Sequence, residues 1–458
     1  MIRMQYGTVA DAHVTLEEED LKNPGTVEFN EELLNDATNA AFADQLWVSA
    51  MQLLMPLKIL LFLILLPLLL VVQIIFPSGA KADAVCWLLA LAAVMPINVV
   101  LVEYMDDIAI RFNSDEMAAV VRIFAEHAAE FLISFLTLSH RGKQNVFLVK
   151  PLLFGCILAS TLITVGVGLL FAIPSEGTYR LGASVWRNFR SLLVFTSVCF
   201  VLPTLYSISA RLSQSGINKT SGIEMEFNPL ADDLQISRFL ALLAIGVYVL
   251  VLASGLGSGT HLYASAGNAV TPTSLTYAIQ YVHSGQEYKD ACPIFEIRYS
   301  INFAITGAIV TLTLLLGVCH ILAEKMVQTS HVLSLPLSFV VVVLVPLVLR
   351  GGSICGAAFM ASVGRLDIAI CMGLSGALRI FHSVLPLVLL FAWPFGNPVD
   401  LVLPPFLAGV CLLLIMMVSH LGGEGTLQRV DGIVLVAFYA LVVCACLLGG
   451  SDIVMLEM

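Results

Sequence analysis

The residues best suited to ion chemistry in this 458-residue sequence lie inside apolar stretches, where charged side chains are rare. They are Glu126, His127, Glu130, Arg350 and Arg379. A charge at the centre of a bilayer costs about 2.5–3.5 kcal/mol on insertion scales, so such residues are usually paired and functional. Carboxylates and imidazoles exchange protons and bind cations, whereas a guanidinium group stays protonated. The sequence therefore predicts an ion or proton site within the membrane.

Arg350 ends the apolar run LSLPLSFVVVVLVPLVL and is followed by Gly351, Gly352 and Ser353. A glycine pair at membrane depth predicts a broken helix, and broken helices form the ion sites of secondary transporters. The alternative is a helix end, from which the arginine would reach the membrane surface along its aliphatic stem. The next residues, SICGAAFMASVG, are still apolar, which favours a position inside the membrane.

The two glutamates are spaced for a common helix face. Glu126 and Glu130 are four residues apart, and His127 precedes Glu130 by three, so each pair faces the same way on a helix. These three residues are therefore the candidates for binding a cation or a proton. The alternative is a structural role, in which Arg122 pairs with Glu126 one helical turn away.

Two further ionisable residues have secondary roles in this scheme. Asp106 precedes the stretch that contains the glutamates, and it belongs either to the ion path or to a solvated helix end. His382 lies in an apolar segment, where it either relays protons or packs as a buried side chain.

Composition fixes the class of protein. Hydrophobic residues make up 59% of the chain and charged residues 12%, whereas soluble domains contain about 25% charged residues. The chain is therefore an integral, polytopic membrane protein that contacts lipid. No basic patch indicates a nucleic-acid partner, and no nucleophile–base pair, phosphate loop or metal-ligand set indicates an enzyme or a cofactor.

Apolar runs long enough to cross a bilayer predict about eleven transmembrane helices. They lie near residues 53–76, 84–102, 117–138, 146–173, 191–210, 239–257, 302–323, 332–362, 368–393, 401–421 and 432–450. Ten of them form two blocks of five, and the polar helix is the second member of each block. Because each block has an odd number of helices, the second block would insert upside down relative to the first.

The predicted fold is thus all-helical, with one leading helix and two inverted five-helix repeats. The predicted divisions are an acidic soluble tail (1–52), the leading helix (53–76), the first repeat (84–257), a linker loop (258–301) and the second repeat (302–450).

Several segments resemble a known family. SFVVVVLVPLV at 338–348, LDIAICMGLSGALRIFHSVLPLVLLFAW at 366–393, ISRFLALLAIGVYVLVL at 236–252 and FRSLLVFTSVCFVLPTL at 189–205 resemble the calcium/cation antiporter superfamily, most closely its vacuolar-type calcium/proton exchangers. The resemblance implies a transporter of a vacuolar or other endomembrane. Calcium or another cation and the proton are then its substrates, and no cofactor is implied.

The resemblance also implies where the ion site lies. Each family repeat carries a Gly-Asn-Ala-x-Glu motif whose glutamate binds the cation. In the second repeat, Leu349 and Arg350 stand where Gly-Asn is expected, and Ser353 stands where the glutamate is expected. Arg379 stands where the following helix has a glutamine. In the first repeat, one register aligns Glu126 with the asparagine, and the other aligns His127 with the asparagine and Glu130 with the glutamate.

Three functions are consistent with this altered site. The first is a cation/proton antiporter that works through Glu126, His127 and Glu130. The second is a transport-silent or regulatory relative, in which Arg350 and Arg379 fill the ion site with fixed positive charge. The third is a transporter of an anion, since arginine and glycine-rich helix ends bind anions well. The sequence does not give the oligomeric state.

Overall fold

The computed structural model describes most of the predicted membrane region. The described residues are 64–73, 79–112, 115–139, 147–172, 179–180, 183–220, 229–257, 299–362, 366–395, 399–420 and 426–449. All of them belong to one unit, Ala50–Met458. The predicted acidic tail, most of the leading helix and nearly all of the predicted linker lie outside the described residues.

The first half of the described chain is helical apart from one short strand. Its elements are α3 (Ala80–Ala109), α4 (Asp115–Glu126), α5 (Ala128–Ser139), α7 (Val149–Leu158), the π-helix η1 (Ala159–Thr164), α8 (Val165–Phe171), β1 (Tyr179–Arg180), α9 (Ala183–Thr220) and α10 (Pro229–Gly257). A short apolar helix, Ile64–Gln73, precedes them.

The second half has a similar order of elements. They are α12 (Ile301–Val332), α13 (Leu337–Phe339), η2 (Val340–Leu344), α14 (Val345–Leu349), α15 (Gly351–Ser362), α16 (Leu366–Arg379), η3 (Ile380–Val384), α17 (Leu385–Ala392), α18 (Pro405–His420), β2 (Thr426–Leu427) and α19 (Arg429–Leu448). In each half a long helix precedes a broken helix, which precedes a helix with a π-helical segment.

The apolar composition explains why nearly every element is a helix, because a helix satisfies its own backbone groups in lipid. Among the described residues, seven helices are long and apolar enough to span a membrane, and the bent pair α13–α15 makes an eighth. Three shorter apolar helices also occur, namely Ile64–Gln73, Ala128–Ser139 and Pro405–Val418. Each predicted segment contains one of these helices, and the count of eleven complete crossings stays a prediction.

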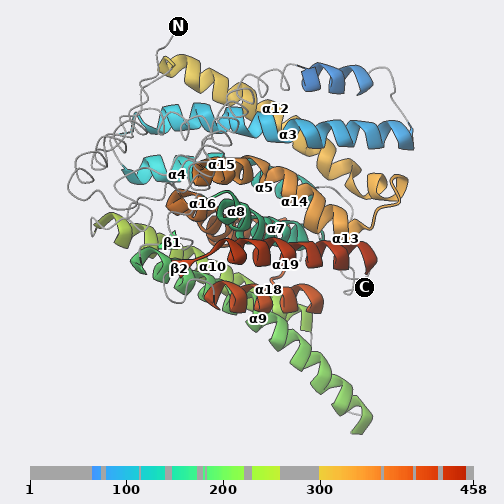
Figure 1. The fold of residues 1–458 in the computed structure, drawn as a ribbon. Helices are drawn as coiled ribbons and strands as arrows, with labels where there is room; N and C mark the ends of the chain where they lie inside the picture. The colour runs from blue at the N-terminus through green and yellow to red at the C-terminus, as the bar shows by residue number, and fades with distance from the viewer. Residues whose placement is uncertain are drawn as a thin grey trace, which may run out of the picture. The chain divides into compact units, whose positions relative to one another are not determined.

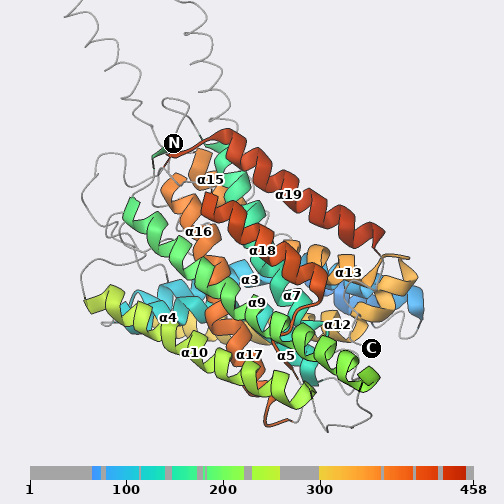
Figure 2. The same cartoon turned by 90° about the horizontal axis from the view of Figure 1, so that it is seen from below.

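The helices are arranged around a buried centre. Figure 1 shows α3 and α12 on one side and α9, α10 and α18 on the other, and Figure 2 shows the latter three together again. The central helices are Val149–Phe171, whose membrane window is 89% buried, and Ile368–Ala392, at 78%. The α19 window is only 28% buried, as suits a helix at the rim.

Among the described helices, α3 and α12 form the most extensive pair. Near one end Trp87 donates a hydrogen bond to the carbonyl of Leu322, and at the other end Arg111 donates to the carbonyl of Tyr299. The start of α3 therefore lies beside the later part of α12, so the two helices run antiparallel.

The π-helical segments have local causes. Pro346 and Pro386 stand just after η2 and η3. A proline has no N–H for the carbonyl four residues earlier, so the hydrogen bonding there must change, and a π turn is one such change. In η1 the hydroxyl of Thr164 donates to the carbonyl of Ala159 at 3.3 Å, which competes with the backbone ladder.

Two expectations about segment boundaries were wrong. The predicted helix 117–138 is two helices, α4 and α5, separated at His127. The helix predicted at 84–102 continues to Ala109 and includes Asp106.

Candidate functional site

The two broken helices meet at their breaks. Arg350 links α14 to α15 with φ −88° and ψ 0°, and the two arms are bent by 52°. This is the break that the glycine pair predicted. His127 links α4 to α5, and its Nδ1 lies 3.3 Å from Arg350 Nη1. The residues at both breaks are therefore in direct contact.

A network of charges surrounds this contact. Arg350 Nη1 donates to Glu130 Oε1 at 3.2 Å, and its Nη2 donates to Glu126 Oε1 at 3.5 Å. Arg379 Nη1 donates to the other oxygen of Glu126. One guanidinium thus bridges both carboxylates, and the second holds the remaining oxygen of Glu126. With both carboxylates ionised, two negative and two positive charges sum to zero.

The network is deeply buried. Arg350 and His127 are 1% exposed, Glu130 is 0% exposed and Arg379 is 8% exposed. The helix-end alternative required Arg350 to reach the membrane surface. Its burial excludes that alternative. Electrostatic interactions are stronger here than at a surface because little water screens them.

The glycine pair allows α3 to approach the break. A Cβ atom on Gly351 would lie 3.0 Å from the sulfur of Met95, and one on Gly352 would lie 3.3 Å from Val99. Ser353 follows in the first turn of α15 and is half-buried. Among the described residues its hydroxyl contacts neither glutamate through a hydrogen bond.

Asp106 lies in a second pair of charges. Its Oδ1 is 3.4 Å from Arg122 Nε, and Asp106 is 3% exposed. The interpretation of Asp106 as a solvated acid was therefore wrong. The structure pairs Arg122 with Asp106, where the structural alternative had proposed Glu126. The next acid, Asp107, is paired with Arg111 at 2.7 Å.

His382 is packed among aromatic rings. It is 1% exposed, its ring stacks with Phe195 and Tyr248, and Phe381 meets it edge-on. Its Nδ1 lies 2.9 Å from the carbonyl of Leu378. These contacts agree with the buried-histidine interpretation, and none of them joins His382 to the carboxylates.

Gly376 and Ser160 are functional candidates that the sequence analysis missed. Gly376 lies on α16, one turn before Arg379, and directly contacts the guanidinium of Arg350. Ser160 lies in η1 beside it. Both residues are small, and nothing in the sequence indicates that Arg350 would lie against them.

The residues present fit a cation only in part. Within the described ranges, no group of three or more His, Cys, Asp and Glu side chains is arranged to hold a metal ion. Glu130 Oε2 is buried and has no hydrogen-bond partner among the described residues. The remaining carboxylate oxygens of the network already accept from arginine.

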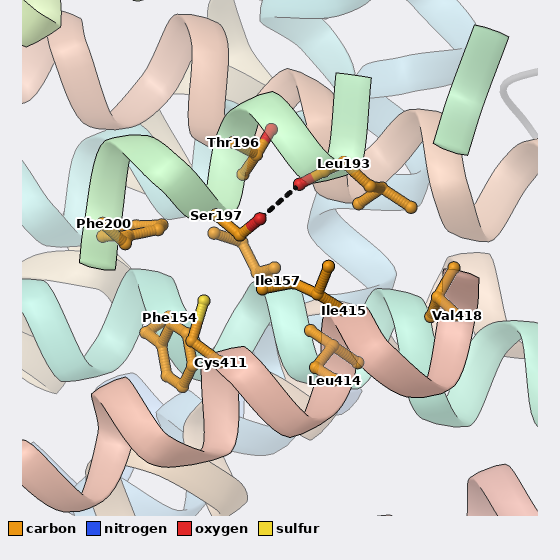
Figure 3. Close-up of a pocket in the computed structure, with 10 residues that line it drawn as sticks. All are labelled: Phe154, Ile157, Leu193, Thr196, Ser197, Phe200, Cys411, Leu414, Ile415 and Val418. Carbon is orange, nitrogen blue, oxygen red and sulfur yellow. Dashed lines mark hydrogen bonds between the residues drawn. The ribbon is translucent and has the colours of Figure 1, made fainter. Parts of the chain in front are cut away.

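A separate hollow lies between α7, α9 and α18 (Figure 3). Its lining residues are Phe154, Ile157, Leu193, Thr196, Ser197, Phe200, Cys411, Leu414, Ile415 and Val418. The hydroxyls of Thr196 and Ser197 donate to carbonyls of their own helix, at Leu192 and Leu193. The hollow is therefore apolar and offers no charged ligand to an ion.

Comparison with known proteins gives a consistent set of relatives. No protein-family profile matches the chain. A "Ca(2+)/H(+) antiporter" of Synechocystis sp. is 21% identical over 364 residues, which cover 79% of this chain and 91% of that protein. "Vacuolar cation/proton exchanger 1a" of Oryza sativa subsp. japonica is 26% identical over 330 residues, which cover 70% of this chain and 65% of that protein.

Solved structures agree on the fold. Native YfkE matches with a TM-score of 0.62 at 16% identity, covering 85% of this chain and 99% of that chain. The H+/Ca2+ exchanger CAX matches with a TM-score of 0.54 at 13% identity, covering 87% and 89%. The chain is therefore similar in sequence to calcium/proton and cation/proton exchangers, and it shares the fold of these solved structures. It spans slightly less than two thirds of the rice exchanger's length.

Proposed function

We propose that this chain is a cation/proton antiporter-like membrane transporter, with calcium or another inorganic cation as its substrate. The observation that carries the proposal is the pair of carboxylates, Glu126 and Glu130, presented by one broken helix toward another. Broken helices that meet at membrane depth are a recurrent way to bind ions in secondary transporters. The relatives named for calcium/proton or cation/proton exchange support the same activity. A vacuolar or other endomembrane location belongs to this proposal.

The proposed architecture is one leading helix and two inverted five-helix repeats, 84–257 and 302–450, joined by a linker. The similar order of elements in the two halves supports it. The breaks at His127 and Arg350 fall in the second helix of each half, where inverted repeats would bring them together.

Arg350 must move before a divalent cation can bind in this site. An ion held by Glu126 and Glu130 would lie about 5 Å from the guanidinium. At an effective dielectric near 20 the repulsion would be about 6–7 kcal/mol. This corresponds to a factor of about 10⁴–10⁵ in affinity. In this conformation the guanidinium of Arg350 therefore repels a divalent ion from the site.

A second candidate function follows from the same charges. The chain would be a transport-silent or regulatory relative, locked by Arg350 and Arg379 against Glu126 and Glu130. The zero sum of the buried charges and the burial of Arg350 favour this candidate. They do not favour an anionic substrate, because both guanidinium groups already face carboxylates.

Ion flux in sealed proteoliposomes separates the two candidates. Calcium uptake driven by a proton gradient and abolished by Glu130→Gln would support exchange. Absence of calcium and proton flux in the unmodified chain would support the silent relative. In that case, recovery of calcium flux in Arg350→Asn with Ser353→Glu would identify those positions as the lock. A folded double variant that stays silent would contradict both the charge argument and the alignment.

A further inference from the structure

The guanidinium of Arg350 lies in a slot whose floor is the backbone of α16. A Cβ atom built on Gly376 would collide with Arg350 Nη2 and would lie 3.3 Å from Cζ. Any other residue at this position would therefore occupy the space of the planar group. Only the missing side chain of Gly376 lets the guanidinium lie against this helix.

Ser160 forms a second wall of the slot. Its Oγ is 3.7 Å from the same Cβ position, and the residue is 0% exposed. Among the described residues neither this hydroxyl nor Arg350 Nε has a hydrogen-bond partner. A buried hydroxyl without a partner is unusual, so Ser160 is a polar group available to whatever occupies the slot.

The walls are held at a fixed distance. A Cβ atom on Gly373 would lie 2.8 Å from the carbonyl oxygen of Ser160. The helix α16 and the segment η1 are therefore in close contact one turn away from Gly376. Packed interiors transmit such constraints because they contain few voids.

The carboxylates complete a geometry that suits a planar fork. Glu130 accepts from Nη1 and Glu126 accepts from Nη2 of the same group. A guanidinium presents several donors in one plane, so it can bridge two carboxylates from two nitrogens. An ammonium group or a spherical ion carries its charge on one atom and has no such fork.

We propose that Glu126, Glu130, Gly376 and Ser160 form a binding slot for a guanidinium group, and that Arg350 is its tethered occupant. Gly376 and Ser160 are then the residues that determine specificity, because Gly376 leaves room for the planar group and Ser160 places beside it a hydroxyl that has no hydrogen-bond partner among the described residues. The proposal concerns the same carboxylates as the proposed function. Its test measures binding alone, so either can fail without the other.

Truncation of the tether gives the test. Arg350→Ala, purified as the full chain in detergent, should bind free guanidinium ion and gain thermal stability from it. We expect a saturable rise of about 2–4 °C in Tm at millimolar guanidinium. Potassium at equal ionic strength should give no such rise. An equal response to both ions, or none to either, would overturn the proposal.

A matched pair of double variants tests the slot itself. Arg350→Ala with Gly376→Leu fills the slot, so the guanidinium response should disappear. Arg350→Ala with Gly246→Leu changes a glycine with nothing within 4 Å of its Cβ position, so the response should remain. Equal responses from the two double variants would show that guanidinium binds elsewhere.

The truncated protein could fail to fold in ordinary buffer. The yield of monodisperse Arg350→Ala protein is then compared after extraction with guanidinium and with potassium. Selective recovery with guanidinium supports the slot, and equal recovery or equal failure contradicts it.

Discussion

The coupling between Arg350 and Glu130 is the most direct energetic test of the buried network. Glu130 is bonded to the guanidinium of Arg350 at 3.2 Å, whereas Glu126 is also held by Arg379. Truncating Arg350 therefore leaves Glu130 without a guanidinium partner, and Glu126 keeps one. The direct attraction at this distance is about 5 kcal/mol at an effective dielectric near 20. Removing one partner of a buried pair costs about 3–5 kcal/mol.

A double-mutant cycle measures this coupling. Arg350→Ala and Glu130→Ala should each destabilise the protein by about 3–5 kcal/mol. The double variant should lose much less than the sum, because no charge is left without its partner. The expected coupling is about 2–3 kcal/mol, at the upper end for contacting residues. Reversible unfolding of the detergent-solubilised chain, followed by intrinsic fluorescence, gives the four stabilities.

The chain offers a matched control. His320 and Glu324 are 3.8 Å apart on α12 and are 51% and 52% exposed, so their coupling should stay below about 1 kcal/mol. If the Arg350 and Glu130 effects add within about 0.5 kcal/mol, as distant sites do, the two groups are not paired in the folded protein.

Four further predictions concern residues away from the network. Lys150→Met should lower the free energy of unfolding by about 3–5 kcal/mol, because Asp400 loses a buried partner at 2.6 Å; adding Asp400→Leu should restore part of it. Gly432→Ala should cost about 1–3 kcal/mol by overpacking α19 against α8, since its Cβ atom would lie 2.8 Å from a backbone carbonyl oxygen. Gly246→Ala has open space and should be neutral or slightly stabilising in the same unfolding assay. His382→Phe should keep whatever ion flux the unmodified chain has, because the residue packs among rings; a selective loss of proton flux would instead favour the relay.

Much of the fold was predictable because lipid permits few alternatives. Apolar runs locate the helices, and the glycine pair after Arg350 locates one break. No glycine or proline beside His127 marks the second break in the sequence.

The candidate site was predictable in its members and not in its pairings. Buried charges need partners, and a site in which the two arginines meet the glutamates was one of the three alternatives that the sequence left open. The way α14, α15 and α16 cross decides which arginine bridges both carboxylates. Residue spacing along one helix does not predict how helices cross. The role of Gly376 is of the same kind, because it depends on a side chain 26 positions earlier in the chain.

The balance of charge at the two breaks has an electrical consequence. Moving one elementary charge across a membrane potential involves about 2.3 kcal/mol per 100 mV. With Arg350 and Arg379 matched by ionised Glu126 and Glu130, the network carries no net charge. Its displacement as a unit along the membrane normal would then be insensitive to voltage. Neutralising either arginine would leave one charge unmatched. The membrane potential would then favour the conformation in which the site faces one side of the membrane over the conformation in which it faces the other.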